Sequence, residues 1–288
     1  MRQFFSPLRY PGGKSCIYSF ISSLFHENNL IGVNYAEPYA GGAGLALKLL
    51  FNEFVEKIYI NDYDVGIYSF WNEILTNANS FCNWINDVDI NIENWMYYKN
   101  ILSNKFNVDK SDLSKAVFFL NRTNVSGVLK GGPIGGLLQQ GKYKIDVRFN
   151  RDDLIKKIQR ISSLNNRIIL SNQDGIEFIK RIDRSNKDTL IYLDPPYYQK
   201  GSNLYMNFYS DKDHLALAKF LDKIKSLWLV SYDNHKFILD IYKEKRKILY
   251  KLSQNTSNRI GDEIMIFSEE IYFEKSINFL NNPVILPI

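Results

Sequence analysis

The residues Asp194-Pro195-Pro196-Tyr197 combine groups that could hold and activate an amino group. They follow Thr189–Leu193, an apolar run that predicts a buried parallel strand. The motif is therefore expected at a strand's carboxyl end, where open α/β sheets bind ligands. The Asp194 carboxylate and the Pro195 carbonyl can each accept a hydrogen bond from an amine, and Tyr197 offers a flat face to a planar base. The alternative is a strand that ends in an ordinary Pro-rich turn.

A second pattern, near the N-terminus, is typical of a site for a nucleotide-like ligand. Residues 32–37 predict a short strand, residues 38–44 a glycine-rich turn, and residues 45–54 a helix. A further strand over 57–60 ends at Asn61-Asp62, where an acidic side chain can bind ribose hydroxyls. The alternative is a plain tight turn, but its combination with Asp62 favours the ligand site.

Composition limits the class of protein. The chain has 288 residues, 45% of them hydrophobic, so one large domain or a domain with an insertion is expected. A net charge of +5 is compatible with a nucleic-acid partner. Two cysteines and three scattered histidines show no metal-ligand spacing, so we expect no metal. Without a signal peptide or an apolar run of membrane-spanning length, the sequence predicts a cytoplasmic protein with no membrane partner.

The segment Gly12-Gly13-Lys14-Ser15 superficially suggests a phosphate-binding loop. That motif requires a glycine where this chain has Leu8, and no strand precedes the segment. Two alternatives remain, an ordinary loop or a lid whose Tyr10 and Lys14 face a bound cofactor.

Taken in order, these motifs resemble the Dam-like, alpha-group N6-adenine DNA methyltransferases nearly end to end. The resemblance rests on residues 10–14, residues 37–44, Asn61-Asp62 and residues 194–197. Asn121-Arg122 with Gly127 resembles a signature of that family's DNA-binding insertion, and residues 170–175 resemble the acidic strand-end element before the catalytic motif. Residues 231–235 and 259–263 fit later strands of the fold. The glycine-rich turn departs from the usual family spacing because Ala43 stands before Gly44.

The resemblance implies S-adenosyl-L-methionine as the cofactor. It places Tyr10 and Lys14 over the cofactor, Asp62 at its ribose and Asp174 at its adenine amino group. Catalysis is implied for Asp194, Pro195 and Tyr197 around the target adenine, with Asp194 also beside the cofactor. The floor of the cofactor site is implied to consist of Glu37, Tyr39, Gly41 and Gly44.

The resemblance also implies an α/β fold, a Rossmann-like doubly wound methyltransferase sheet with a reversed last strand. The expected catalytic domain comprises residues 1–64 and 166–288. Residues 65–165 are expected to form an inserted, mainly helical target-recognition domain with a β-hairpin, since helical patterns over 68–75, 95–102 and 113–121 precede a glycine-dense, basic stretch. The expected DNA contacts are Asn121, Arg122, Lys130 and Arg148; the alternative is a long surface loop with solvated charges.

The predicted reaction is site-specific N6 methylation of an adenine that flips out of double-stranded DNA, because its amino group is unreachable inside the duplex. Cytosine N4, RNA or protein-amide methylation would use the same acceptors, and a non-catalytic DNA-binding module is an alternative of another class. Asp194 as the first residue of its motif favours adenine, and the basic insertion favours duplex DNA. We expect a monomer, with a restriction endonuclease of the same system as a candidate counterpart.

Overall fold

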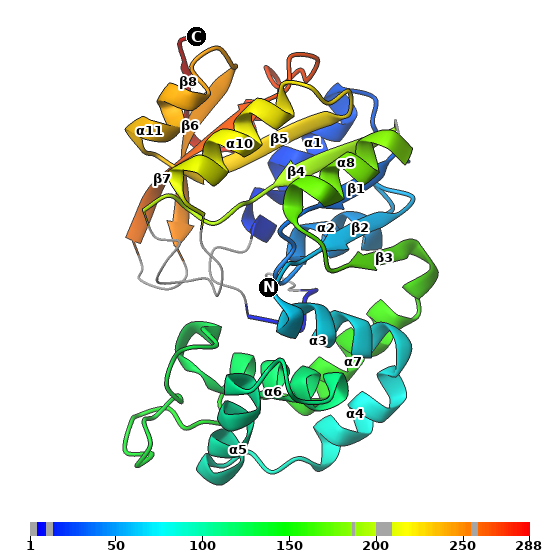
Figure 1. The fold of residues 1–288 in the computed structure, drawn as a ribbon, viewed down its shortest axis with the longest axis vertical. Helices are drawn as coiled ribbons and strands as arrows, with labels where there is room; N and C mark the ends of the chain where they lie inside the picture. Colours follow the sequence, from blue (N-terminus) through cyan, green and yellow to red (C-terminus); the bar gives the residue numbers. More distant parts are fainter. Residues whose placement is uncertain (1–4, 10–13, 186–187, 200–208, 255–258) are drawn as a thin grey trace.

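A computed structural model describes residues 5–9, 14–185, 188–199, 209–254 and 259–288. Its centre is one eight-stranded sheet with the strand order β3-β2-β1-β4-β5-β7-β6-β8 (Figure 1). The strands are β1 (Asn34–Glu37), β2 (Ile58–Asn61), β3 (Ile168–Ser171), β4 (Thr189–Leu193), β5 (Leu227–Asp233), β6 (Lys247–Gln254), β7 (Arg259–Phe267) and β8 (Asn281–Leu286).

Strand direction follows the prediction for most of the sheet. Strands β3, β2, β1, β4 and β5 run parallel to one another, and β7 is antiparallel to both β5 and β6. The expected reversed strand is therefore β7, which lies inside the sheet. Strand β8 pairs antiparallel with β6 and adds a second reversed strand at the edge, which was not predicted.

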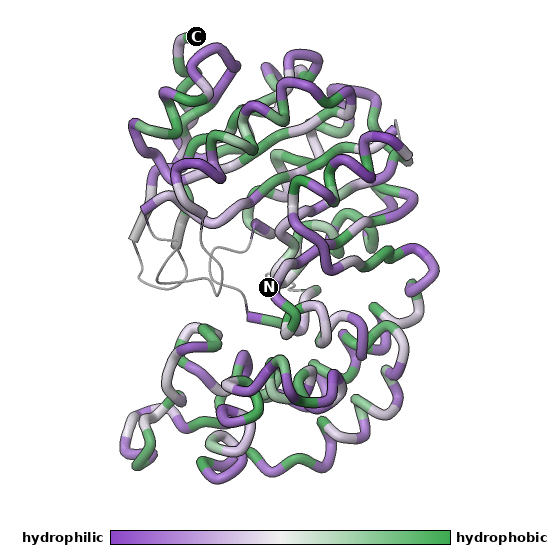
Figure 2. Tube along the Cα trace, viewed as in Figure 1, coloured by the Kyte–Doolittle hydropathy of each residue, from purple (hydrophilic) through white to green (hydrophobic). Residues whose placement is uncertain are grey.

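Helices cover both faces of the sheet, as a doubly wound arrangement requires. Along β4, side chains alternate between two cores, with Leu190 and Tyr192 in one and Ile191 and Leu193 in the other. The second core contains side chains of α8, α10 and α11, and the first those of η1, α1 and α2. Figure 2 shows the apolar residues along the strands and recurring along the helices that cover them. These helices are η1 (Lys14–Ile17), α1 (Tyr18–Glu27), α2 (Gly44–Phe51), α8 (Gly175–Ser185), α10 (Asp211–Leu221) and α11 (Lys236–Ile241).

The segment between β2 and β3 forms a helical region below the sheet (Figure 1). Its interior is rich in aromatic rings, and Phe118 packs against Phe70, Phe81 and Trp84. The predicted helices are present, each longer than its pattern, and the described part of the chain has ten α-helices in all. The elements of this region are α3 (Val65–Thr76), α4 (Ala78–Asp87), α5 (Ile92–Ser103), α6 (Lys110–Thr123), η2 (Val125–Gly127), α7 (Arg151–Ser162) and η3 (Asn165–Arg167).

The predicted β-hairpin in this region was wrong. Residues 65–165, all of which are described, contain no strand, and the only pairing is an isolated bridge between Asn124 and Pro133. The backbone of Gly127, Gly135 and Gly136 adopts positive φ, which produces successive turns in place of paired strands. The stretch after α6 is therefore a folded loop.

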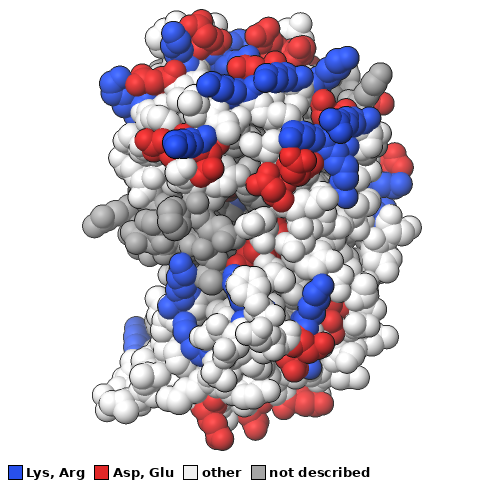
Figure 3. Space-filling model, viewed as in Figure 1, with Lys and Arg blue, Asp and Glu red and all other residues white. Residues whose placement is uncertain are grey.

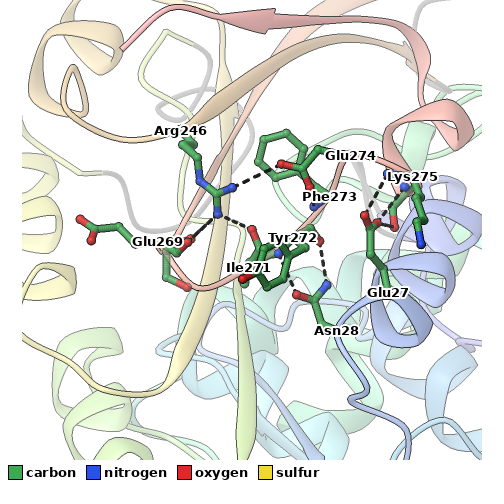
Figure 4. A network of polar contacts seen from close by, with 11 residues as sticks. Glu27, Asn28, Arg246, Glu269, Ile271, Tyr272, Phe273, Glu274 and Lys275 are labelled. Atoms are coloured by element: carbon green, nitrogen blue, oxygen red, sulfur yellow. Dashed lines mark hydrogen bonds and ion pairs between the residues drawn. The ribbon is translucent and has the colours of Figure 1, made fainter.

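Polar contacts attach the segment after β7 to the N-terminal helix (Figure 4). Glu27 accepts hydrogen bonds from the backbone N–H groups of Lys275 and Ser276, each at 2.9 Å. Asn28 exchanges two bonds with the backbone of Tyr272, and Arg246 donates to the carbonyl of Glu269 at 2.7 Å. The chain leading to η4 (Ser276–Phe279) and β8 is thus fixed against α1 and the start of β6. Within the described residues, no helix is both long and apolar enough to cross a membrane.

Candidate active site

A cavity of about 910 Å³ lies between the carboxyl ends of the parallel strands and the helical region. Its size is within the range of cavities that bind small ligands and cofactors. Gly41, Pro195 and Tyr197 do not line it, and Tyr10 lies outside the described residues. The remaining predicted residues all line it: Lys14, Glu37, Tyr39, Gly44, Asp62, Asn121, Arg122, Lys130, Arg148, Asp174 and Asp194.

The glycine-rich turn after β1 positions an acidic side chain. The Gly41 N–H donates to Asp62 Oδ2 at 2.9 Å, and the Gly41 carbonyl accepts from the Trp71 indole at 2.8 Å. Ala43 has φ 45°, the left-handed conformation that costs a non-glycine residue about 1–2 kcal/mol. The turn therefore forms despite its departure from the usual spacing, and Gly41 acts through Asp62.

Asp62 itself lies at the end of β2. Its other oxygen, Oδ1, accepts a hydrogen bond from the Asp64 N–H at 2.9 Å. Burial raises the pKa of Asp62 to about 7, and these two backbone bonds oppose the increase. Each carboxylate oxygen has two lone pairs, so each can still accept one further bond from a ligand.

Glu37 forms the end of β1 and is buried. One oxygen accepts from the Tyr35 hydroxyl and from the Ala46 N–H, both at 3.1 Å. Burial, followed by the nearby charge of Asp194, raises the pKa of Glu37 to about 8 against the effect of its hydrogen bonds. Glu37 is thus a second carboxyl group whose ionisation falls near neutral pH.

Asp174 and Tyr39 form another part of the wall. Asp174 is exposed and caps α8, since its Oδ1 accepts from the backbone N–H of Ile176 at 2.9 Å. The Tyr39 hydroxyl bonds that of Tyr209 at 2.8 Å. Gly175 lies against Tyr39, and a methyl group there would lie 2.5 Å from the Tyr39 hydroxyl oxygen. A helix cap and a close ring contact together shape this end of the cavity.

Asp194 immediately follows β4, and 19% of its side chain is exposed. Its Oδ1 accepts from the Lys14 ammonium at 2.7 Å and from the Ser231 hydroxyl at 3.2 Å. Burial raises the pKa of Asp194, Lys14 opposes this effect, and the charge of Glu263 adds to it. The following backbone is held by Asp233, whose two oxygens accept from the N–H groups of Tyr198 and Gln199. The predicted catalytic motif is therefore held at its first residue and by the two residues that follow it.

Tyr197 lies behind this wall, and only 6% of it is exposed. Its hydroxyl oxygen accepts from Lys14 at 2.5 Å, and its O–H donates to Glu263. The expected stacking of Tyr197 on a base stays a prediction.

The helical region supplies the basic wall of the cavity. Figure 3 shows Lys and Arg side chains on the part of this region that faces the sheet. Arg122 uses its guanidinium within the protein: Nε donates to the Arg148 carbonyl at 2.8 Å, and another nitrogen donates to the Pro7 carbonyl at 3.3 Å. Burial lowers the pKa of Arg122 to about 10, as do the charges of Arg9 and Arg148. These contacts favour a bracing role for Arg122.

Asn121 is also engaged inside the protein. Its amide exchanges two hydrogen bonds with the backbone of Arg9, at 2.7 and 2.8 Å, and donates a third to the Gly127 carbonyl at 3.0 Å. Both of its N–H groups are therefore used. The side chains of Lys130 and Arg148 are exposed at the rim, which leaves them better placed for DNA than Asn121.

No role was predicted for four residues of this region: Arg9, Ser231, Asp233 and Glu263. Glu263 could have been identified from the sequence, because a carboxylate within the apolar run of β7 is expected to be buried and a buried charge needs a partner. Arg9 had no such signal, because its bond to the Asn124 carbonyl joins residues far apart in the chain. Among the described residues, no group of histidine, cysteine and acidic side chains could hold a metal ion.

Comparisons with known proteins identify the family of this chain. A family model described as D12 class N6 adenine-specific DNA methyltransferase matches residues 10–257. The sequence is 25% identical over 276 residues to a DNA adenine methylase of Haemophilus influenzae, with 88% of this chain and 89% of that relative covered. A solved Streptococcus pyogenes structure titled as a conserved hypothetical protein is 11% identical, with 84% of this chain and 89% of that chain covered. Its TM-score of 0.32 is too low to support a conclusion about the fold.

Proposed function

The chain belongs to the D12 class of N6 adenine-specific DNA methyltransferases, and we propose that its cavity holds both substrates of the transfer. The target adenine would bind at Asp194, and S-adenosylmethionine along the ends of β1 and β2. One observation carries this assignment: a single cavity brings Glu37, Asp62 and Asp194 together opposite a wall of basic residues.

The residues of the cavity fit S-adenosylmethionine, which supplies a methyl group on a positively charged sulfur. Asp62 keeps an acceptor position on each oxygen, as two ribose hydroxyls require. The buried Glu37 would provide negative charge in its ionised form, which a bound cation would favour. Asp174 uses Oδ1 to cap α8, which leaves Oδ2 for an amino group of the cofactor's adenine.

Asp194 would act on the target amino group. The lone pair of adenine N6 is conjugated with the ring, so the nitrogen is a weak nucleophile. A hydrogen bond from N6–H to Asp194, with a second to the Pro195 carbonyl, favours the tetrahedral nitrogen that attacks the methyl group. The ionised carboxylate then stabilises the positive charge that develops on nitrogen, a contribution of about 3–4 kcal/mol for one preorganised group.

Delivery of the adenine requires base flipping, which costs roughly a few kcal/mol of lost pairing and stacking. Tyr197 does not line the cavity in the structure described, so stacking on the flipped base, worth about 1–3 kcal/mol, would require its ring to turn toward the base. Asp194 and Tyr197 belong to the same four-residue motif, so the acceptor and the stacking face lie close together in the chain.

Double-stranded DNA would lie against the helical region. We assign residues 65–165 to target recognition and residues 1–64 and 166–288 to catalysis and cofactor binding. Lys130 and Arg148, both exposed at the cavity rim, would contact DNA, whereas Arg122 and Asn121 would hold the loop that presents them. This arrangement places positive charge on the substrate side of the cavity.

Two other functions use parts of this geometry. Cytosine N4 methylation would use the same acceptors, but the family favours adenine. A non-catalytic DNA-binding module would not need a buried carboxylate at the end of β4 with two hydrogen-bond donors on one oxygen.

The test is transfer of a radiolabelled methyl group to duplex DNA by Asp194→Ala. Transfer should fall by at least about 100-fold, while cofactor binding persists. The matched control is Asp240→Ala, an exposed carboxylate paired with Lys236 on α11. Near-normal turnover of folded Asp194→Ala would contradict the proposed mechanism.

A further inference from the structure

A buried charged network lies behind the catalytic motif, centred on Glu263 in β7. Only 2% of the Glu263 side chain is exposed. It accepts hydrogen bonds from the Tyr250 hydroxyl at 2.8 Å and from the Tyr197 hydroxyl, and Oε2 lies 3.6 Å from the Lys14 ammonium. A carboxylate this buried requires such partners, and here two of the three belong to the proposed active site.

Lys14 connects Glu263 to Asp194. Only 3% of the Lys14 side chain is exposed, and its ammonium lies 2.7 Å from Asp194 Oδ1 and 2.5 Å from the Tyr197 hydroxyl oxygen. An ammonium has three donors and no acceptor, so one cation is shared by two carboxylates and one phenol. Displacement of Glu263 would therefore alter both Lys14 and Tyr197.

We propose that Glu263 is a positioning residue for methyl transfer, which fixes Lys14 and the Tyr197 hydroxyl and thereby sets the place and electrostatic surroundings of Asp194. This inference rests on the proposed role of Asp194. Glu263 would not touch either substrate, since it does not line the cavity.

The competing interpretation is that Glu263 only stabilises the sheet. Tyr250 stands opposite Glu263 in the β6–β7 pairing, so their bond would form in any such sheet. A purely structural role would affect folding and the amount of active enzyme. It would not change the pH at which the catalytic carboxyl ionises.

The positioning role predicts opposite pH effects for the two partners of Asp194. The charge of Glu263 raises the pKa of Asp194, and the charge of Lys14 lowers it. Transfer requires the ionised Asp194, so kcat falls as pH falls through its pKa. This fall in kcat is the acid limb of the pH–rate profile. Loss of the Glu263 charge should move the acid limb to lower pH, and loss of the Lys14 charge should move it to higher pH. The other titratable groups facing the network are unchanged in both variants: Tyr35, Glu37, Tyr192, Tyr197 and Tyr250.

The experiment compares single-turnover methylation of duplex DNA by wild type, Glu263→Gln and Lys14→Met at saturating cofactor, from about pH 5 to 9. We expect at least about a tenfold loss of kcat at neutral pH in Glu263→Gln, with its acid limb about one unit lower and that of Lys14→Met about one unit higher. The matched control is Glu269→Gln, whose side chain is 79% exposed.

An unchanged kcat and acid limb in Glu263→Gln would overturn the inference, and so would a reduced kcat with no shift of the limb in either variant. If Glu263→Gln does not fold, Tyr197→Phe decides: it removes the hydroxyl that donates to Glu263 and keeps the ring, so a reduced kcat supports the network and an unchanged kcat refutes it. Loss of transfer in Asp194→Ala combined with a normal Glu263→Gln would remove this inference only. Normal transfer in Asp194→Ala would instead remove the proposed function.

Discussion

Asp62→Asn should remove the part of the pH dependence of cofactor affinity that Asp62 contributes near neutral pH. Burial raises the pKa of Asp62 to about 7, so its carboxyl is about half protonated at neutral pH. Only the ionised form offers two oxygens that are purely acceptors. A ligand that donates hydroxyl protons to both oxygens should therefore select the ionised form.

The magnitude follows from that pKa. With a value of about 7, the ionised fraction rises from about 0.1 at pH 6 to about 0.9 at pH 8. A ligand restricted to the ionised form should bind about tenfold more tightly at pH 8, a difference of about 1.4 kcal/mol. In Asp62→Asn the amide NH₂ faces the N–H group of either Gly41 or Asp64, so one of these two hydrogen bonds is lost. This loss should weaken cofactor binding by about 1–3 kcal/mol at every pH.

The same shift has a consequence for stability. The folded pKa of Asp62 lies above its ordinary value of 3.8, so the folded state favours the protonated carboxyl. Its contribution to folding is therefore most favourable at acidic pH and is lost as pH rises from about 4 through about 7. The ligand-free protein should lose stability over this window, and Asp62→Asn should lose less.

Calorimetric titration with S-adenosylhomocysteine between about pH 6 and 8 would measure the effect. Glu37, whose pKa is raised to about 8, titrates in both proteins, so the difference between wild type and variant isolates Asp62. Asp240→Asn is the control for an exposed carboxylate. Parallel affinity curves in wild type and Asp62→Asn would refute the contact between Asp62 and the ribose.

Other substitutions test the DNA side and the cofactor wall. Arg122→Ala should destabilise the protein by about 1.5–3 kcal/mol because two carbonyls lose a charged donor, and chemical denaturation would measure this; unchanged stability would contradict the bracing role. Lys130→Ala should weaken binding to cognate and scrambled duplexes alike and reduce the salt slope by about one, and an unchanged slope would remove Lys130 from the phosphate contacts. Gly175→Ala should displace Tyr39 and break its bond to Tyr209, which should destabilise the fold by about 1–3 kcal/mol. Cofactor binding, measured by titration, should also weaken. Wild-type stability together with wild-type cofactor affinity would show that the Tyr39 ring adapts.

Much of the sheet could be predicted because its strands carry a strong local signal. The run Thr189–Leu193 is buried at every position and forms β4 with the expected bounds. Strand β8 could not be predicted in the same way, because it starts with two asparagines and Pro283 and most of its residues are exposed. At the edge of a sheet the core does not select apolar residues, so the strand pattern is absent.

The loop after α6 shows a different limit. Glycines and alternating apolar residues over 127–149 are compatible with either a hairpin or a chain of turns, and the sequence does not specify which. The Gln139 side chain decides between them, because it bonds to the backbone of Ile134, Gly136 and Ile145 within the loop. Such side-chain contacts compete with strand pairing and leave no periodic pattern.

For the candidate site, the location of its residues could be predicted better than the contacts that each side chain makes. Glu37, Asp62 and Asp194 end neighbouring parallel strands, and those ends meet at one edge of the sheet, so their proximity follows from the motifs. The availability of each side chain depends on contacts made far along the chain. Arg122 was predicted to contact DNA, yet three of its five N–H donors bond to carbonyls of residues 7 and 148.

Arg9 and Lys14, which flank residues outside the described part of the chain, contact opposite sides of the cavity. Arg9 is hydrogen-bonded to Asn121 and to the Asn124 carbonyl in the helical region, and Lys14, five positions later, is bonded to Asp194. Residues only five positions apart in the chain thus contact opposite sides of the cavity, and no local pattern in the sequence specifies either contact.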